Sequence, residues 1–539
     1  MVHDPDALRR YPHPSSRAAV LATDGVVATS QPLAAQAGLD VLADGGNAVD
    51  AAIAAAATLT VVEPCSNGLG SDAFAIVWDG SELHGLNGSG RWPAAYDADE
   101  LRAAGHREVP QRGWTPVTVP GAVDTWDALH GRFGQLDMAR ILEPAHRYAV
   151  RGHPVSPVVS RQWRASAQFF GALDDPAIAD WSTVFAPGGR APEAGEMWAS
   201  PGHARTLARL ASHGLREFYE GEIAAAIVDY STRTGGRMTA DDLASHRAEW
   251  VDPISVAYRD HEVWEIPPNG QGLAALLAIG AVAHHDIGAR AHVDAEAWHT
   301  QIEAMKLAFA DSDAAVADQQ HVPVPVAELL APDRLAARAA EIGPLAGPAP
   351  NGEPVRGGTV YLCTADRDGM MVSFIQSNYM GFGSGVVVPS HGVSLQNRGA
   401  GFVLDAAHPN VAAPGKRPRH TIIPGFLTRA GTPVGPFGVM GGEMQPQGHL
   451  QVVSGLVDHG LNPQAALDAP RWQVDRDGTV NLEPQVPAEI VAALAERGHP
   501  TKVATSRLPF GRGQIIVRDD QGVYAAGSEP RADGAAVGR

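Results

Sequence analysis

The chain has 539 residues, of which 45% are apolar, so it can bury one large core or two to three smaller ones. Its 41 basic and 60 acidic side chains leave a formal net charge of −19. Such a charge repels nucleic-acid phosphates and anionic lipid head groups. We therefore expect neither a nucleic acid nor a membrane as partner, and small-molecule chemistry is favoured.

The two cysteines, Cys65 and Cys363, lie far apart and belong to no CxxC motif or Cys/His cluster. This argues against a disulfide framework and against a cysteine-based zinc site. Cys363 lies in an apolar strand pattern and is expected to be a packing residue. The first 20 residues are broken by charges and prolines and hold no signal-peptide pattern. No later segment approaches the roughly 18 apolar residues of a membrane helix, so we expect a soluble cytoplasmic protein.

Three helices are predicted from periodicity. Residues 34–62 carry apolar side chains at helical spacing on both sides of Asp44-Gly-Gly-Asn47, and the paired glycines indicate a turn between two packed helices. Residues 299–311 are predicted to form an amphipathic helix with Ile302 and Met305 on its apolar face. These helices are expected to serve as scaffold.

A loop followed by a β-hairpin is predicted in the middle of the chain. Residues 343–358 are rich in proline and glycine and show neither a helical nor an alternating pattern. Such a segment is a natural place for the backbone to be cut. The strand-like runs 359–364 and 370–377 then flank the turn signal Asp366-Arg-Asp-Gly369.

The register of this hairpin determines which side chains meet at its open end. If Arg367 and Asp368 form a two-residue loop, Thr359 faces Gln376 and lies one step from Ser377. Two hydroxyl groups are therefore expected to lie close together.

A threonine at the start of this strand has a chemical use. Its hydroxyl is a weak nucleophile unless a base takes its proton, and an α-amino group, with a pKa of about 7.7–8.0, is such a base. Gly357 and Gly358 precede Thr359. Glycine at 358 lets the hydroxyl of Thr359 approach the preceding carbonyl for an N-to-O acyl shift and scission. An ordinary strand that begins with threonine fits these residues equally.

A second glycine pair, Gly441-Gly442, follows the apolar run 434–440 and precedes a predicted helix around 447–457. Backbone N–H groups at such a turn can point together at an anion, as the oxyanion of a tetrahedral intermediate requires. The alternative is an ordinary tight turn.

Several motifs occur together in the order found in one family, and on them the chain resembles the γ-glutamyltranspeptidases from about residue 25 to residue 538. The motifs are Gly25–Gly46 with Asn47-Ala-Val-Asp50, Glu63-Pro with Gly68-Leu-Gly70, Pro267-Pro-Asn-Gly-Gln-Gly272, the helix Ile302–Phe309, the Thr359 hairpin, Phe382-Gly-Ser-Gly385, Lys416-Arg-Pro418 and Gly441-Gly442.

The resemblance implies an α+β fold, the four-layer αββα sandwich of the N-terminal-nucleophile hydrolases. Members of the family are made as one inactive chain that cuts itself. The cut would fall between Gly358 and Thr359, and would leave a large piece 1–358 and a small piece 359–539 as a tightly associated pair within one intertwined sandwich.

The resemblance also implies roles for individual residues. Thr359 would be the nucleophile and its freed amine the base, while Gly441 and Gly442 would form the oxyanion hole. The family has a hydroxyl residue eighteen positions after the nucleophile that bonds to it, and Ser377 holds that position.

The residues that would bind the donor depart from the family pattern. An arginine four positions before a proline normally binds the α-carboxylate of a γ-glutamyl group. Counting back from Pro93 places Ser89 there, while Arg91 lies two positions later and would need a shifted path to the site.

Further departures concern both ends of the donor's amino acid group. Two serines normally complete the carboxylate contacts, and His420 and Thr421 hold their positions. The amino group normally meets an asparagine, a glutamine and an aspartate, which are replaced by Tyr379, Arg398 and Gly401. A guanidinium repels an ammonium group and favours an anion.

These features predict a self-processing amidohydrolase that transfers a γ-glutamyl or similar carboxyl-bearing acyl group from an amide to water or an amine. Residues 402–416 look short against relatives with a lid over the site, which favours hydrolysis. A glutaryl- or cephalosporin-type acylase is an alternative, and so is an uncleaved, non-catalytic member that binds a small molecule.

Other classes of enzyme lack support in the sequence. A conventional serine hydrolase would need a GxSxG elbow, which does not occur. HExxH, Walker and dinucleotide fingerprints do not occur either. We therefore expect neither a metal nor another cofactor.

Overall fold

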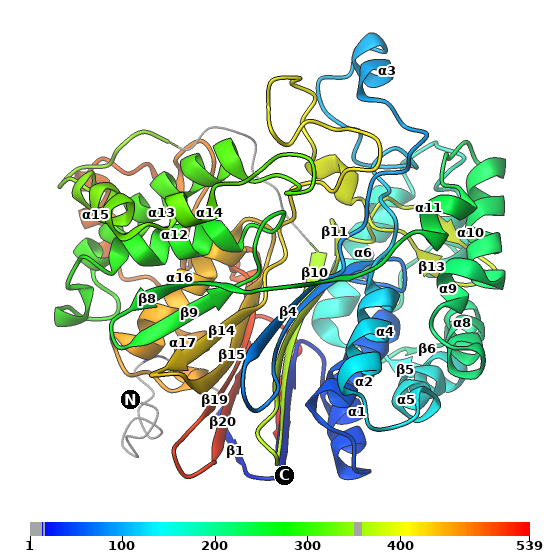
Figure 1. Ribbon diagram of the computed structural model, residues 1–539, viewed down its shortest axis with the longest axis horizontal. Coiled ribbons are helices and arrows are strands. Elements are labelled where there is room, and N and C mark those ends of the chain that lie inside the picture. The colour runs from blue at the N-terminus through cyan, green and yellow to red at the C-terminus, as the bar shows by residue number, and fades with distance from the viewer. Residues whose placement is uncertain (1–12, 14–16, 350–357) are drawn as a thin grey trace.

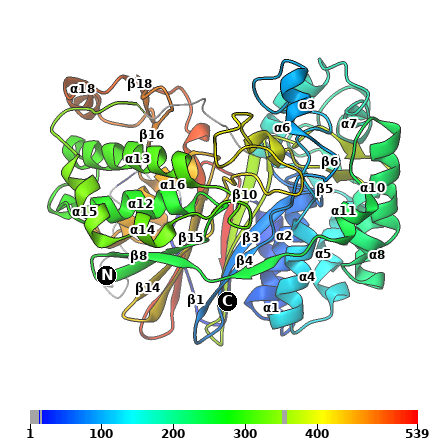
Figure 2. The same cartoon turned by 45° about the horizontal axis from the view of Figure 1, so that its top comes forward.

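The computed structural model describes residues 13, 17–349 and 358–539. Two antiparallel seven-stranded sheets, sheet A and sheet B, lie face to face in the centre, and helices cover the outer face of each (Figure 1). Figure 2 shows the same order of layers from a second direction. The expected α+β fold, a four-layer αββα sandwich, is confirmed.

The strands of each sheet come from both sides of residue 358. Sheet A has the order β1 (Val20–Ala22), β20 (Tyr524–Ser528), β19 (Arg512–Arg518), β15 (Thr432–Met440), β14 (Gly425–Arg429), β9 (His261–Glu265) and β8 (Ile254–Tyr258). Sheet B has the order β21 (Ala535–Gly538), β2 (Gly25–Thr29), β10 (Gly358–Asp366), β11 (Met371–Tyr379), β3 (Asp72–Trp78), β4 (Leu83–Asn87) and β7 (Glu249–Val251). Two pieces that met at residue 358 would therefore share both sheets.

The helices form two outer layers. Those beside sheet A are α12 (Gly272–Val282), α13 (Ala295–Ala315), α14 (Val326–Leu329), α15 (Pro332–Ala340), α16 (Met444–Val457), α17 (Pro463–Asp468) and α18 (Ala488–Glu496). Those on the side of sheet B are α1 (Pro32–Ala43), α2 (Ala48–Val62), α4 (Ala122–Phe133), α5 (Met138–Arg151), α6 (Pro157–Phe170), α7 (Asp180–Phe185), α8 (Pro201–His213), α9 (Glu217–Glu220), α10 (Glu222–Arg233) and α11 (Ala240–Ala244).

The remaining elements are short. They are α3 (Ala98–Ala103), β5 (His153–Pro154), β6 (Met197–Trp198), β12 (Val387–Val388), β13 (Val393–Ser394), β16 (Trp472–Val474), β17 (Val480–Leu482), β18 (Thr501–Val503), and the 3₁₀ turns η2 (Ile287–Ala289), η3 (Arg398–Gly401) and η4 (Leu508–Phe510).

The two alanine-rich helices form as predicted, as α1 and α2. Asn47 begins α2 with a capping box in which its side chain and that of Asp50 each accept a backbone N–H. The turn before it contains Gly45 at φ 94°, a conformation that suits glycine. The predicted helix 299–311 is also confirmed, within the longer α13.

The apolar core fills the space between the sheets as well as the space under the helices. Tyr361 and Cys363 of β10 lie buried in the inter-sheet cluster, so the packing role expected of Cys363 is confirmed. The ring of Tyr361 takes the space that a Cβ at Gly438 of β15 would need. Sheet A and sheet B therefore approach closely at β10 and β15.

The β10–β11 hairpin exists as predicted, but the predicted register is wrong by one residue. Thr359 pairs with Ser377 rather than with Gln376. The loop has three residues, because the N–H of Asp366 bonds to the carbonyl of Met370 and Gly369 takes φ 91°. Three-residue hairpin loops commonly end in such a left-handed glycine.

The predicted cleavage loop is described only in part. Residues 350–357 of the predicted cleavage loop lie outside the described part of the chain, whereas Gly358 is the first residue of β10. Among the described residues, no helix is long and apolar enough to cross a membrane. The cytoplasmic location stays a prediction.

Candidate active site

Three polar side chains form a row across neighbouring strands of sheet B. Thr359 of β10 pairs with Ser377 of β11, and Ser377 pairs with Asp72 of β3. Side chains alternate between the faces of a strand, so Thr359 shares the face of Tyr361, which lies between the sheets. Directly opposed residues of antiparallel strands share a face. All three polar groups therefore point into the inter-sheet space, and all are fully buried.

The hydroxyl groups of Thr359 and Ser377 are in direct contact with the peptide bond predicted to be cut. Thr359 Oγ1 lies 2.9 Å from Ser377 Oγ, and Ser377 Oγ donates to the carbonyl oxygen of Gly358 at 3.0 Å. Ser377 Oγ also accepts the backbone N–H of Tyr379 at 2.8 Å, and either hydroxyl can supply the proton between Thr359 and Ser377. Ser377 can thus polarise the carbonyl that Thr359 would attack.

Gly358 lies where a larger residue would crowd the neighbouring backbone. A Cβ at this position would approach the Cys65 carbonyl oxygen to 3.1 Å and backbone atoms of Gly381 to 3.2 Å. The atoms contacted belong to the backbone, which can move aside less easily than a flexible side chain. Glycine therefore lets the scissile peptide lie against Ser377.

Arg398 brings a buried positive charge to the same place. Its guanidinium donates to Ser377 Oγ at 3.2 Å and to Thr421 Oγ1 at 2.8 Å, and its Cζ lies 4.2 Å from the ring centroid of Tyr379. Burial lowers the pKa of Arg398 to about 10, opposed by Asp72 and Tyr379. The guanidinium therefore stays charged near neutral pH. Three of the predicted donor-binding residues, Arg398, Thr421 and Tyr379, lie together near Ser377.

His420 also joins this cluster, through Asp72. His420 Nε2 lies 3.0 Å from Asp72 Oδ2, and Nδ1 accepts the N–H of Ile422 at 3.4 Å. This pattern assigns the proton to Nε2, so His420 donates to Asp72. Burial, aided by Arg398, holds the pKa of His420 well below its ordinary value, which keeps the ring neutral. Both ring nitrogens are engaged.

Arg91 lies apart from this group. Its guanidinium contacts Asp318 at 3.2 Å and Glu249 at 3.3 Å, and it also donates to the carbonyl of Gly415. Within the described ranges, no hydrogen bond or ion pair joins Arg91 to Thr359. A donor contact for Arg91 stays a prediction, and it would have to compete with these two carboxylates.

The Gly441-Gly442 turn joins β15 to α16 as predicted. Both residues take positive φ, 144° and 63°, which suits glycine. The side-chain amide of Gln271 donates to the carbonyls of Gly442 at 2.9 Å and Thr421 at 2.6 Å. Gln271 thus ties the glycine turn to the residue that holds Arg398. The oxyanion role of the two glycines stays a prediction.

A pocket of about 550 Å³ begins at this turn. Besides Gly441, its lining includes Met440, Lys502, Phe510 and Arg512. A group joined to a carbonyl held at Gly441 would have room on this side. The pocket does not include Arg398 or His420, which pack among their neighbours.

Two residues of the site were not predicted from the sequence. Asp72 had a signal, because it is an acidic residue that opens the otherwise apolar strand β3, and a buried carboxylate needs partners. Gln271 lay within a quoted motif but carried no chemical signal of its own, since its contacts are to backbone carbonyls distant in sequence.

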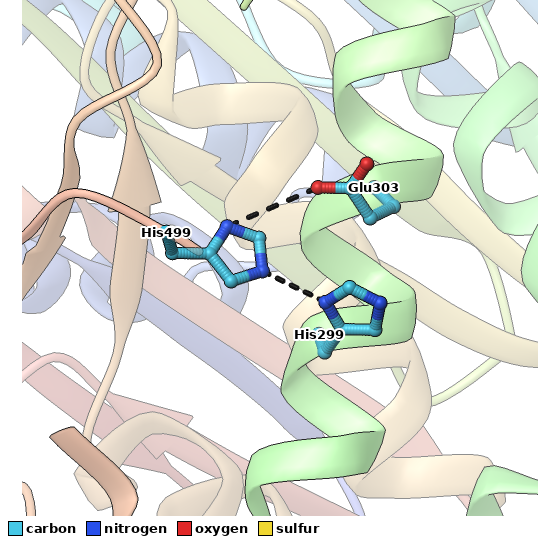
Figure 3. Close-up of side chains that lie close together, drawn as sticks. All are labelled: His299, Glu303 and His499. Atoms are coloured by element: carbon cyan, nitrogen blue, oxygen red, sulfur yellow. Dashed lines mark hydrogen bonds and ion pairs between the residues drawn. The ribbon is translucent and has the colours of Figure 1, made fainter. Parts of the chain in front are cut away.

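Two side-chain groups elsewhere have the composition of a metal site, and one of them is buried. In the buried group His299 and Glu303 of α13 lie beside His499, which follows α18 (Figure 3). The two imidazoles share a hydrogen bond of 2.8 Å, and the ammonium of Lys306 lies 2.8 Å from Glu303. A cation would have to displace both contacts, so the group fits an anchor better than a metal site. It also binds the segment before the predicted cut, through the carbonyl of Gly343.

The four-layer fold is that of the N-terminal-nucleophile hydrolases. The γ-glutamyltranspeptidase family model matches residues 34–539. The chain therefore belongs to the γ-glutamyltranspeptidase family, and it is a self-processing hydrolase or acyltransferase that acts on amide bonds.

Individual relatives cover the whole length. The crystal structure of a cephalosporin acylase from Bacillus halodurans matches with a TM-score of 0.93 and 52% identity, over 100% of this chain and 99% of that one. The glutathione hydrolase-like YwrD proenzyme of Bacillus subtilis is 37% identical, over 96% of this chain and 99% of its own. The oxamate amidohydrolase proenzyme of Klebsiella pneumoniae is 35% identical over the same shares.

The Thr359–Ser377 contact can be tested by removing one hydroxyl. Ser377→Ala should slow both self-cleavage and turnover about tenfold, since a hydrogen bond of roughly 1–2 kcal/mol is lost. The measurements are the rate at which the small piece appears and the kcat of the mature protein. Ser373→Ala is a matched control, because Ser373 lies on the same strand and bonds the Tyr361 hydroxyl at 2.8 Å. Undiminished rates in Ser377→Ala would contradict the role given to this contact.

Proposed function

We propose that the protein cuts its own backbone between Gly358 and Thr359, and that Thr359 then attacks amides whose acyl group carries a carboxylate. The observation that carries the proposal is the buried guanidinium of Arg398, which bonds the Ser377 hydroxyl beside Thr359. A cation at this distance from the nucleophile can hold the far end of a short diacid chain.

The first step uses groups already in contact. The Thr359 hydroxyl attacks the Gly358 carbonyl, Ser377 donates to the carbonyl oxygen, and the amide becomes an ester after the proton moves to the leaving nitrogen. Water then hydrolyses the ester and leaves the α-amine of Thr359 free. In turnover this amine takes the Thr359 hydroxyl proton and passes it to the departing amine of the substrate.

In turnover the N–H groups of Gly441 and Gly442 would hold the oxyanion when the acyl-enzyme forms and when it is hydrolysed. The pocket that begins at Gly441 gives space for the leaving amine or for an incoming acceptor. We propose hydrolysis as the main reaction, with water as the acceptor, in keeping with the short 402–416 segment.

The donor class follows from charge. Arg398 and Thr421 suit a carboxylate, whereas Arg398 and the ring of Tyr379 offer no acceptor for an ammonium group. Asp72 is a nearby acidic side chain, but its Oδ2 faces His420 and Arg398, so an ammonium group there would also meet the positive charge of Arg398. One relative supports this class, because oxamate, for which it is named, is an amide that carries a carboxylate.

Self-cleavage is tested by mass and by one substitution. Purified protein should consist of two associated pieces, one ending at Gly358 and one beginning at Thr359. Thr359→Ala should remain a single inactive chain, because the strand then begins without a hydroxyl. Intact mass and N-terminal sequencing check both outcomes. A wild-type chain that stays uncut under maturing conditions would contradict the assignment.

The base is tested by pH. The neutral amine of Thr359 accepts a proton and the ammonium form does not, so the chemical rate should fall as the pH drops below the amine's pKa, ordinarily about 7.7–8.0. The measurement is a single-turnover rate across about pH 5–9. A flat profile with chemistry rate-limiting would exclude the amine as base.

Donor choice is tested with paired substrates. Glutaryl amides, which lack the α-amino group, should be hydrolysed at least as well by kcat/KM as the matching γ-glutamyl amides, since an unpartnered ammonium loses several kcal/mol on leaving water. Arg398→Gln should shift the ratio toward the γ-glutamyl donor. Arg259→Gln is the control, because Arg259 follows β8 and pairs with Asp458 at the end of α16. A hundredfold preference for γ-glutamyl amides would mean that other groups hold the amine.

A further inference from the structure

Asp72 is a buried acidic residue that has no role in the proposed reaction steps. It lies two strands from the nucleophile, in the same row as Thr359 and Ser377 and on the same face of sheet B. Its side chain is fully buried. A carboxylate in such a place is costly unless partners offset its loss of hydration.

Asp72 bonds to His420 but makes no hydrogen bond to Arg398, the nearby arginine. Asp72 Oδ2 lies 3.0 Å from His420 Nε2 and 3.9 Å from Arg398 Nε. Within the described part of the chain, Asp72 Oδ1 and Arg398 Nε have no hydrogen-bond partner. The carboxylate and the guanidinium therefore attract each other through charge, without a hydrogen bond that fixes them together.

The other groups around Asp72 are either positive or neutral. Arg417 acts on Asp72 from the segment that also carries His420. His420 is neutral, because burial holds its pKa well below the ordinary value. Tyr219 of α9 also lies within range of the charge of Asp72. Burial raises the pKa of the Tyr219 phenol, so it stays protonated and neutral.

The protonation state of Asp72 is balanced near neutrality. Burial raises its pKa to about 7, while the positive charges of Arg398 and Arg417 act in the opposite direction. A donor carboxylate bound to Arg398 would offset the positive charge that does most to lower the pKa of Asp72. The pKa of Asp72 would then rise further.

We propose that Asp72 determines donor specificity because its carboxylate and the carboxylate of the donor compete for Arg398. In the free enzyme the Asp72 carboxylate neutralises Arg398, and an acyl donor that bears a carboxylate takes over the guanidinium while Asp72 takes one proton from solvent. The total charge of the site is unchanged, since one anion enters and one is protonated. The inference rests on the proposed binding of a donor carboxylate at Arg398.

The sign of the pH effect follows. Below about pH 7 Asp72 is already protonated in the free enzyme, so binding of a carboxylate takes up no proton. Above that pH each binding event takes up a proton, and affinity falls by up to tenfold per pH unit. A donor of equal length without the carboxylate needs no exchange and shows no such dependence.

The test compares two five-carbon donors on the mature enzyme, glutaryl p-nitroanilide and pentanoyl p-nitroanilide, which differ in the terminal carboxylate. Their kcat/KM ratio cancels the titration of the Thr359 amine, which serves both. In wild type the ratio should be constant below about pH 6.5 and fall up to tenfold per unit above about pH 7. In Asp72→Asn it should be independent of pH and at least tenfold higher than wild type at pH 8.5.

A matched control is Glu265→Gln. Glu265 is another fully buried carboxylate that pairs with a buried imidazole, His449, at 2.5 Å, and it ends β9 of sheet A. Its ratio should follow the wild-type curve. The conservative variant Asp72→Glu keeps a titrating carboxyl and should keep a pH-dependent ratio.

The outcomes separate the two proposals. A wild-type ratio that stays far above one but does not change from pH 6 to 9 overturns the role of Asp72 and leaves carboxylate recognition intact. A ratio near one at every pH overturns carboxylate recognition itself. If Asp72→Asn does not fold, the wild-type curve still decides, and an Asp72→Asn curve that falls like wild type overturns the proposal.

Discussion

The hydroxyls of Thr359 and Ser377 meet because a three-residue loop at the far end of the hairpin sets the pairing of β10 with β11. A shift of one residue would place Gln376 opposite Thr359, although the Gln376 amide faces the helices, where it contacts Trp126 and Asn67. Since a one-residue slip turns every side chain to the other face of the strand, the buried packing on both faces of sheet B excludes it.

Charge in an apolar interior is the second constraint. Arg398 can lie near Thr359 because its terminal nitrogens bond Ser377 and Thr421 while Asp72 supplies the negative charge. His420, placed by the sequence among the donor contacts, uses both ring nitrogens on other groups. Its place in the structure is that of a support for Asp72, and Arg398 is left as the group of this cluster best suited to a substrate anion.

The parts of this arrangement that the sequence predicted are those with local signals. Periodicity and glycine turns located α1, α2 and the hairpin, and motif order indicated the four-layer sandwich. The register was missed because Asp366-Arg-Asp-Gly369 fits loops of two or three residues, and the choice depends on Gly369 taking φ 91°. Asp72 was missed for a different reason: its partner His420 lies 348 positions away, and no local pattern reports such a contact.

The uncut chain also explains how one serine can serve two reactions in turn. Ser377 Oγ donates to the Gly358 carbonyl and lies 2.9 Å from Thr359 Oγ1, so its proton is directed at the peptide bond that we propose is cut. Once that peptide is hydrolysed, the Gly358 carbonyl is no longer held beside Ser377 by the chain. The serine proton then becomes available to the Thr359 oxygen, and Arg398 remains on the other side of Ser377. With the cleavage site and nucleophile that we propose, self-cleavage would convert a group that polarises the chain's own carbonyl into one that supports the nucleophile, without any new residue entering the site.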